Sequence, residues 1–106
     1  MNVRYVMPAG AWLCLCAAGA LHAETIHARF DCDGDKSIEA AFDNGPKPSV
    51  ELSLSDGHRW VLPQALSASG ARYANGDDSI VFWNKGNTAF IEEGGRTTYR
   101  ECVAKR

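Results

Sequence analysis

Ser69 and Lys85 are the two side chains of this sequence best suited to act directly on a partner. They lie near the two ends of the stretch SGARYANGDDSIVFWNKG, and each is followed by a glycine, Gly70 or Gly86. A glycine lets the backbone turn tightly and keeps bulk away from an approaching molecule. No catalytic partner for the hydroxyl or the ammonium lies nearby in the sequence. We therefore interpret the pair as one small polar binding site.

The same stretch predicts a β-hairpin that brings these two residues together. In an up-and-down meander, alternate connections lie at the same end of the sheet. The connection before residue 71 carries Ser69 and the connection after residue 83 carries Lys85. Normal strand spacings then place the two residues within roughly 5–10 Å of one another along one edge.

Two registers of this hairpin remain open at the level of the sequence. A turn centred on Gly76 and Asp77 sets Ser69 opposite Asn84. A turn centred on residues 75–76 instead sets Ser69 opposite Phe82. Both are two-residue turns with the residue types that such turns favour.

The elements that must carry this site are strands. Polar and apolar residues alternate with period two, and Gly, Asn, Asp and Pro cluster between the alternating runs. In the first run, Ile26, Ala28, Phe30 and Cys32 share one face. Eight short strands at this spacing predict an all-β fold, which we expect to be an eight-stranded antiparallel β-barrel filled by side chains. The predicted strands are 25–32, 37–43, 49–55, one around residues 60–62, 71–74, 79–83, 88–93 and 96–102.

Residues 1–23 have the features of a secretory signal peptide. Arg4 precedes an apolar run of small residues, and Leu21, His22 and Ala23 form an acceptable cleavage site. Because leucine precedes both Cys14 and Cys16, we expect no lipid attachment there and no covalent membrane anchor. The sequence thus predicts export to the periplasm and one domain over residues 24–106.

Cys32 and Cys102 are the cysteines that remain after residue 23. A domain of 83 residues (106 − 23) buries little apolar surface, so a covalent link is expected. In an oxidising compartment the pair predicts one disulfide that joins the first strand to the last. The chain-entropy model gives such a bridge roughly 4 kcal/mol. The alternative, a metal-binding pair, lacks the additional ligands that a site needs.

The net charge of the chain after residue 23 indicates which classes of binding partner are favoured. Without Arg4, ten basic residues face thirteen acidic ones, a net charge of about −3 with His neutral. This sign disfavours nucleic acid and permits a cationic partner. Asp31, Asp33 and Asp35 alternate as in a calcium loop, but Lys36 and Phe42 stand where an EF-hand needs Gly and Glu. We expect a hairpin turn there, and neither a metal nor a cofactor.

Two linked motifs resemble those of the membrane-bound and periplasmic inhibitors of c-type lysozyme. The first is Ser-Gly-x-x-Tyr, here Ser69 to Tyr73, and the second is aromatic-x-Lys-Gly, here Trp83 to Gly86. The resemblance implies an eight-stranded β-barrel whose Ser69 and Lys85 enter the lysozyme cleft and contact its catalytic carboxylates. It further implies that Tyr73 braces the loop and that Arg72 contacts the cleft wall. Many members of that family are lipoproteins, whereas we expect no lipid-accepting cysteine in this chain, which favours a soluble periplasmic form.

The resemblance implies that this protein inhibits lysozyme and is not itself an enzyme. Two other functions stay open at the level of the sequence. A small-ligand-binding barrel of the envelope would need a cavity, which Trp60 and Trp83 could line, although strand aromatics more often serve packing. A glycan hydrolase would need two carboxylates facing a cleft, and no spacing indicates such a pair. A homodimer is compatible with the sequence.

Overall fold

Eight antiparallel strands close into a barrel in the order in which they follow along the chain. The computed structural model describes residues 24–105, so the predicted signal peptide lies outside the described residues. The predicted all-β barrel is confirmed. Its elements are β1 (Thr25–Cys32), the 3-10 turn η3 (Asp33–Asp35), β2 (Lys36–Asp43), β3 (Ser49–Leu54), β4 (Arg59–Ala65), β5 (Ala71–Ala74), β6 (Ile80–Lys85), β7 (Thr88–Glu93) and β8 (Arg96–Ala104).

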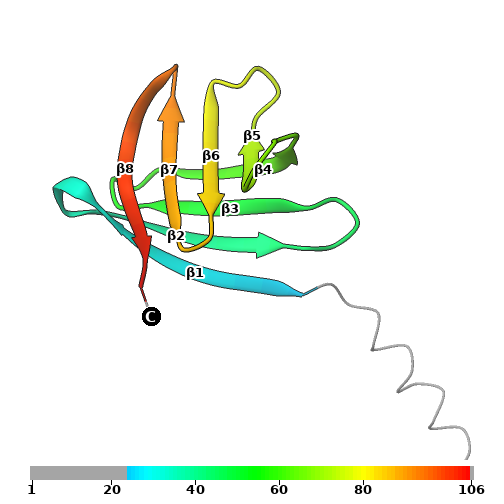
Figure 1. Ribbon diagram of the computed structural model, residues 1–106, viewed down its shortest axis with the longest axis horizontal. Helices are drawn as coiled ribbons and strands as arrows, with labels where there is room; N and C mark the ends of the chain where they lie inside the picture. The colour runs from blue at the N-terminus through cyan, green and yellow to red at the C-terminus, as the bar shows by residue number, and fades with distance from the viewer. Residues whose placement is uncertain (1–23, 106) are drawn as a thin grey trace, which may run out of the picture.

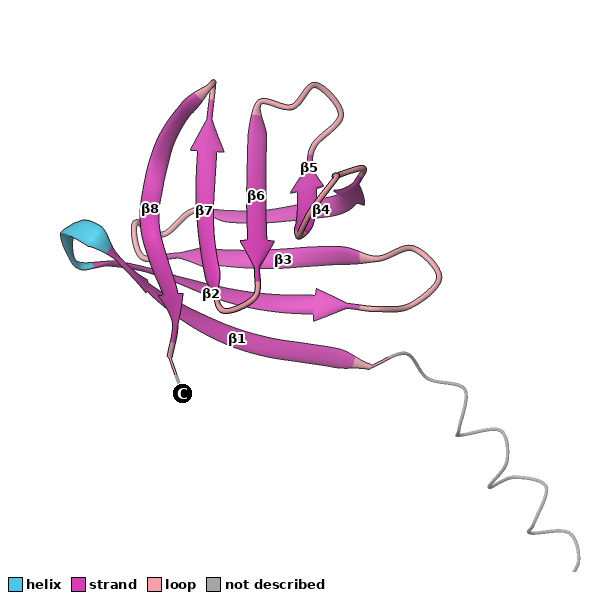
Figure 2. Ribbon diagram, viewed as in Figure 1, coloured by secondary structure: helices cyan, strands magenta, loops and turns pink. Residues whose placement is uncertain are grey.

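The barrel is flattened into two crossing halves. In Figure 1, strands β2 and β3 run across the view, whereas β6, β7 and β8 run nearly perpendicular to them. Figure 2 shows that η3 is a short turn between β1 and β2, with loops linking the other strands. No helix within residues 24–105 has the length and apolar character needed to cross a membrane.

Alternation along each strand produces the core. On β2, Ile38, Ala40 and Phe42 point inward, and on β3 the inward side chains are Val50, Leu52 and Leu54. The rings of Phe42, Tyr73 and Phe82 pack with centroids 5.7–6.2 Å apart. Side chains thus occupy the barrel interior, as expected of eight strands. The largest fully buried ones are Tyr99, Phe30, Phe82, Ile38, Leu52, Leu62, Ile91 and Val50.

The seam between β1 and β8 is short and covalently linked. Phe30 pairs with Ala104 and Asp31 with Val103, and the Lys105 backbone N–H donates to the Arg29 carbonyl at 2.8 Å. Beside it, Cys32 and Cys102 form the predicted disulfide, which spans 70 residues of sequence. β1 reaches β8 only around Arg29 to Asp31, so Ile26 is 49% exposed although it shares a strand face with the buried Phe30.

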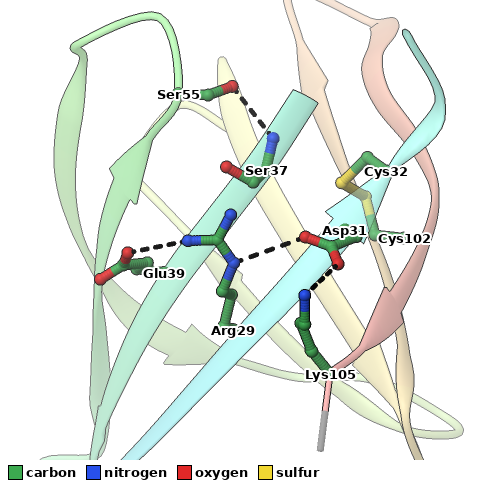
Figure 3. A network of polar contacts seen from close by, with 8 residues as sticks. All are labelled: Arg29, Asp31, Cys32, Ser37, Glu39, Ser55, Cys102 and Lys105. Carbon is green, nitrogen blue, oxygen red and sulfur yellow. Dashed lines mark hydrogen bonds and ion pairs between the residues drawn. A yellow bond between two sulfur atoms is a disulfide. The ribbon is translucent and has the colours of Figure 1, made fainter. Parts of the chain in front are cut away.

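Ion pairs cover the outer face of this seam (Figure 3). Arg29 lies between Asp31, at 3.4 Å, and Glu39, at 3.3 Å. Lys105 approaches the same Asp31 carboxylate at 3.8 Å. All of these side chains are about half exposed, so each pair contributes little to stability and mainly fixes local charge balance.

Candidate functional site

The site is built on the contact between Gly70 and Lys85. Gly70 has φ +71°, a conformation that L side chains rarely adopt. A Cβ added to Gly70 would lie 3.0 Å from the Asn84 carbonyl oxygen and 3.2 Å from the Lys85 Cβ. The β4–β5 connection therefore lies directly on the end of β6, and a side chain at position 70 would force its neighbours to move by a few tenths of an ångström.

This contact puts Ser69 and Lys85 beside one hollow of about 300 Å³. Both residues are exposed, and Lys85 forms no ion pair with the other residues of the described chain. The sequence-based expectation that the two residues share one rim agrees with this arrangement. We call Ser69, Gly70, Lys85 and Gly86 the Ser–Lys rim. The hollow is also lined by Trp83, Thr88, Ala89 and Phe90.

Hydrogen bonds hold both halves of the Ser–Lys rim. On the β4–β5 side, the Ser67 hydroxyl donates to the Gly70 carbonyl at 2.8 Å. On the β6–β7 side, the Thr88 hydroxyl donates to the Lys85 carbonyl at 2.9 Å. The Asn84 amide donates to the carbonyls of Gly86 and Thr88, at 3.1 and 3.0 Å. The loops are thereby ordered before any partner arrives, which lowers the entropy lost on binding.

The hairpin register differs from both predicted alternatives. Ala71 pairs with Asn84 and Ala74 with Val81, two residues away from the nearer prediction. The turn is longer than two residues because the Asn75 side chain accepts from the backbone N–H of Ile80 at 3.0 Å and donates to the Ser79 hydroxyl at 2.7 Å. Asp78 takes φ +60° within it. The shift moves Ser69 toward the level of the turn that follows Lys85.

Arg72 lies on the outer face of β5 and contacts the hollow only through Trp83, without lining it. Its guanidinium pairs with Asp78 at 3.0 Å and lies over the Trp83 ring, 5.8 Å from the centroid. The side chain is 21% exposed. These contacts hold Trp83 in place, while the contact with a cleft wall that the resemblance implies stays a prediction.

Tyr73 lies inside the barrel, where it is 5% exposed. Its ring packs against Phe42 and Phe82, and burial raises the pKa of its hydroxyl. From this position Tyr73 anchors β5, three residues after Gly70. The predicted bracing of the loop would therefore act through the core.

Three apolar side chains around the Ser–Lys rim were not assigned to the site from the sequence. Trp83 and Phe90 are cross-strand partners on β6 and β7, with near-parallel rings 6.1 Å apart. Leu66, in the β4–β5 connection, is 93% exposed. The alternation of side chains along a strand could have indicated Trp83, because it stands two residues before Lys85 and thus on the same side of β6.

Comparison with known proteins identifies the family. The sequence model described as membrane-bound lysozyme-inhibitor of c-type lysozyme matches residues 30–99, which include Ser69, Tyr73 and Lys85. Proteins named membrane-bound lysozyme inhibitor of C-type lysozyme match from Yersinia enterocolitica (38% identity) and Escherichia coli (33% identity), each over 74% of this chain.

The matched region covers 62% of the length of the Yersinia relative and 68% of the Escherichia one. A third relative of the same name, from Cupriavidus necator, is 32% identical over 73% of this chain and 64% of its own length. No solved structure matches the chain significantly. The closed barrel, its disulfide and the matched motifs agree with the family match, and the chain belongs to the family of membrane-bound lysozyme inhibitors of c-type lysozyme.

Proposed function

We propose that this protein inhibits c-type lysozyme by inserting the Ser–Lys rim into the active-site cleft of the enzyme. The observation that supports the proposal is the close contact of Gly70 with Lys85. This contact holds the exposed Ser69 hydroxyl and the exposed Lys85 ammonium beside one hollow. Inhibition is then occlusion of the cleft. It needs no chemistry on this chain, in keeping with a family named for inhibitors.

The chemistry of the enzyme makes it a fitting target for this pair. C-type lysozyme cleaves glycans with one carboxylic acid and one ionised carboxylate. An ammonium 4 Å from a carboxylate gains roughly 4 kcal/mol at an effective dielectric constant of 20, before desolvation is subtracted. The Ser69 hydroxyl adds about 1 kcal/mol through a hydrogen bond. Lys85 is therefore expected to dominate the polar part of the interaction.

Apolar contact has to supply the remaining affinity. A specific interface buries about 800 Å² on each partner, far more than two polar side chains offer. Trp83 and Phe90 line the hollow beside the Ser–Lys rim, and the exposed Leu66 lies in the connection that carries Ser69, so together they offer the apolar area that interface centres contain. We therefore place these three side chains in the contact surface, beside the contacts proposed for Arg72 and Gly86.

Charge favours fast association with a cationic enzyme. The chain from residue 24 on carries about −3 with His neutral, and its acids are spread over several strands and turns. Opposite net charges raise the association rate, and salt suppresses that gain. We also propose that residues 1–23 direct export to the periplasm, where the inhibitor would meet a lysozyme entering the envelope.

A binding barrel for small molecules is less well supported, because aromatic and aliphatic side chains pack the described interior. The direct test is a turbidity assay of bacterial cell walls with a c-type lysozyme and the purified chain 24–106. We expect inhibition that saturates near one inhibitor per enzyme and weakens as salt is raised. Undiminished lysis at a large molar excess of the chain would contradict the proposal.

A further inference from the structure

A groove between η3 and β8 gathers three cationic side chains, Lys36, Arg96 and Arg100. Its volume is about 660 Å³, and all three cations are exposed. Thr97, Thr98 and Gly34 complete most of its lining. For a chain with a negative net charge, this local excess of positive side chains needs an explanation.

The cations of this groove differ from most of the others because they form no ion pairs with acids of the described chain. Of the nine Lys and Arg residues between positions 24 and 105, four form ion pairs with acids, namely Arg29, Arg59, Arg72 and Lys105. Five do not, and three of those five line this groove. The other two are Lys85, in the Ser–Lys rim, and Lys47, in the β2–β3 loop.

Contacts with β8 hold two of these cations in place. The Lys36 ammonium donates to the Thr98 carbonyl at 2.7 Å and lies 4.8 Å from the centre of the Tyr99 ring. The Arg100 guanidinium donates to the Thr97 carbonyl at 2.9 Å. Each side chain keeps further N–H donors, since an ammonium has three and a guanidinium five.

Two acids, Asp33 and Glu93, also line the groove. Glu93 is the direct cross-strand partner of Arg96, yet its carboxylate accepts a hydrogen bond from the Thr98 hydroxyl at 2.6 Å and forms no ion pair within the described chain. Asp33 is likewise in no ion pair among residues 24–105. The three cations therefore outnumber the acids of the groove and remain available to an external anion.

We propose that this groove binds a phosphate group. Two guanidinium groups and one ammonium can together place several charge-assisted hydrogen bonds on a tetrahedral dianion, and arginine is the side chain best matched to phosphate oxygens. Thr97 lines the same wall and adds a hydroxyl donor, whereas the Thr98 hydroxyl is already donated to Glu93. A free phosphate and the headgroup of a phosphomonoester lipid both offer this chemistry, and the test below distinguishes the two sources.

The groove and the Ser–Lys rim lie at opposite ends of the barrel. The β1–β2 and β7–β8 connections flank the groove, whereas the β4–β5 and β6–β7 connections carry the rim. In a closed meander these two sets of connections are at different ends. Phosphate binding is thus independent of the proposed inhibition and leaves the rim accessible.

The test is a titration of the 15N-labelled chain 24–106 with sodium phosphate at pH 7.5, against sodium chloride of equal ionic strength. We expect phosphate-specific shifts of the Gly34, Lys36, Thr97 and Thr98 amides. The double variant Arg96→Gln/Arg100→Gln should bind phosphate at least about tenfold more weakly, since each lost contact is charge-assisted. Lys47→Ala, which removes an unpaired cation elsewhere, should bind within about twofold of the parent chain.

The source of the phosphate is decided by sedimentation with vesicles of phosphatidylcholine alone or with phosphatidic acid. Co-sedimentation with phosphatidic acid that the double variant abolishes identifies a lipid headgroup, and phosphate shifts without co-sedimentation identify a free phosphate. Shifts that sodium chloride reproduces, or that the double variant retains, overturn the proposal. Lysozyme inhibition by the double variant should stay unchanged, so this test can fail without affecting the proposed function.

Discussion

Gly70 lies so close to Lys85 that a single added carbon on Gly70 would stand 3.2 Å from the Lys85 Cβ. Gly70 lies in the β4–β5 connection and Lys85 ends β6, fifteen positions later in the sequence, yet this approach sets where the ammonium is held. Two constraints meet at Gly70, because its φ of +71° is also unfavourable for any L side chain. The position of the lysine is therefore sensitive to the glycine.

Gly70→Ala should weaken lysozyme inhibition and destabilise the fold by about 1–2 kcal/mol, through the left-handed backbone and the contact with Lys85. Inhibition constants and urea denaturation measure the two effects. Gly94→Ala is the matched control, because Gly94 has φ +60° but nothing within 4 Å of an added Cβ. This control should lose stability and keep inhibition. Equal inhibition by the Gly70→Ala and Gly94→Ala variants would show that Gly70 does not position the site.

Lys85→Ala should weaken inhibition at least tenfold while the free energy of unfolding changes by less than about 0.5 kcal/mol. The reason is that the exposed ammonium has no acid partner within the described chain, and the turn is held by the Lys85 carbonyl, which the substitution retains. Lys47→Ala removes a comparable exposed cation at the β2–β3 loop and should leave inhibition unchanged. If Lys85→Ala loses stability and inhibits normally, the lysine serves only the structure of the turn and not the binding of lysozyme.

Replacement of both disulfide cysteines by serine should lower the free energy of unfolding by about 4 kcal/mol. Backbone contact of β1 with the C-terminal segment covers three consecutive residues, Arg29 to Asp31, so the bridge is a large part of what closes the barrel. Urea denaturation of the oxidised chain 24–106 and of the double serine variant gives the difference. A change below about 1 kcal/mol would mean that core packing alone keeps the seam closed.

Arg72→Ala should act on stability more than on inhibition. The side chain is engaged by Asp78 and by the Trp83 ring, which together are worth about 1 kcal/mol at a partly exposed site. Because Trp83 also lines the hollow, a loss of inhibition of a few fold is expected. Asp78→Asn breaks the ion pair and keeps the guanidinium over Trp83, so it should inhibit nearly as well as the parent chain. A loss in Arg72→Ala far beyond a few fold would indicate direct contact of Arg72 with lysozyme.

The fold was readable from sequence because alternation along a strand directly reports which side chains are buried. Ile38, Ala40 and Phe42 lie inside as their spacing predicts, and the disulfide follows from the positions of two cysteines. The β5–β6 register was not readable, since it depends on the Asn75 side chain replacing backbone partners in the turn.

The exposure of Ile26 was equally hidden from the sequence. It depends on where β1 separates from β8, which is a property of barrel closure and not of local pattern. The same holds for the site. Motif spacing indicated Ser69 and Lys85, whereas the apolar surface from Trp83 and Phe90 needs the register of β6 and β7.

Asp56, in the β3–β4 turn, should make stability depend on pH in the acid range. The backbone N–H of His58 donates to this carboxylate at 2.9 Å, and the His58 side chain lies 3.1 Å from it. These contacts, the backbone hydrogen bond foremost, hold the pKa of Asp56 below its usual 3.8 although burial opposes them. The carboxylate therefore stabilises the fold above pH 4, and this contribution is lost as pH falls through the lowered pKa.

Asp56→Asn should accordingly be less stable than the parent chain at pH 7, and the two stabilities should converge toward pH 2–3. The carboxylate is about half exposed, so solvent screening keeps the difference below about 1 kcal/mol. Urea denaturation at several pH values measures it. Glu24→Gln serves as control, because that carboxylate forms no ion pair among residues 24–105. A constant gap between Asp56→Asn and the parent chain from pH 7 to pH 2 would show that shape at this turn matters and charge does not.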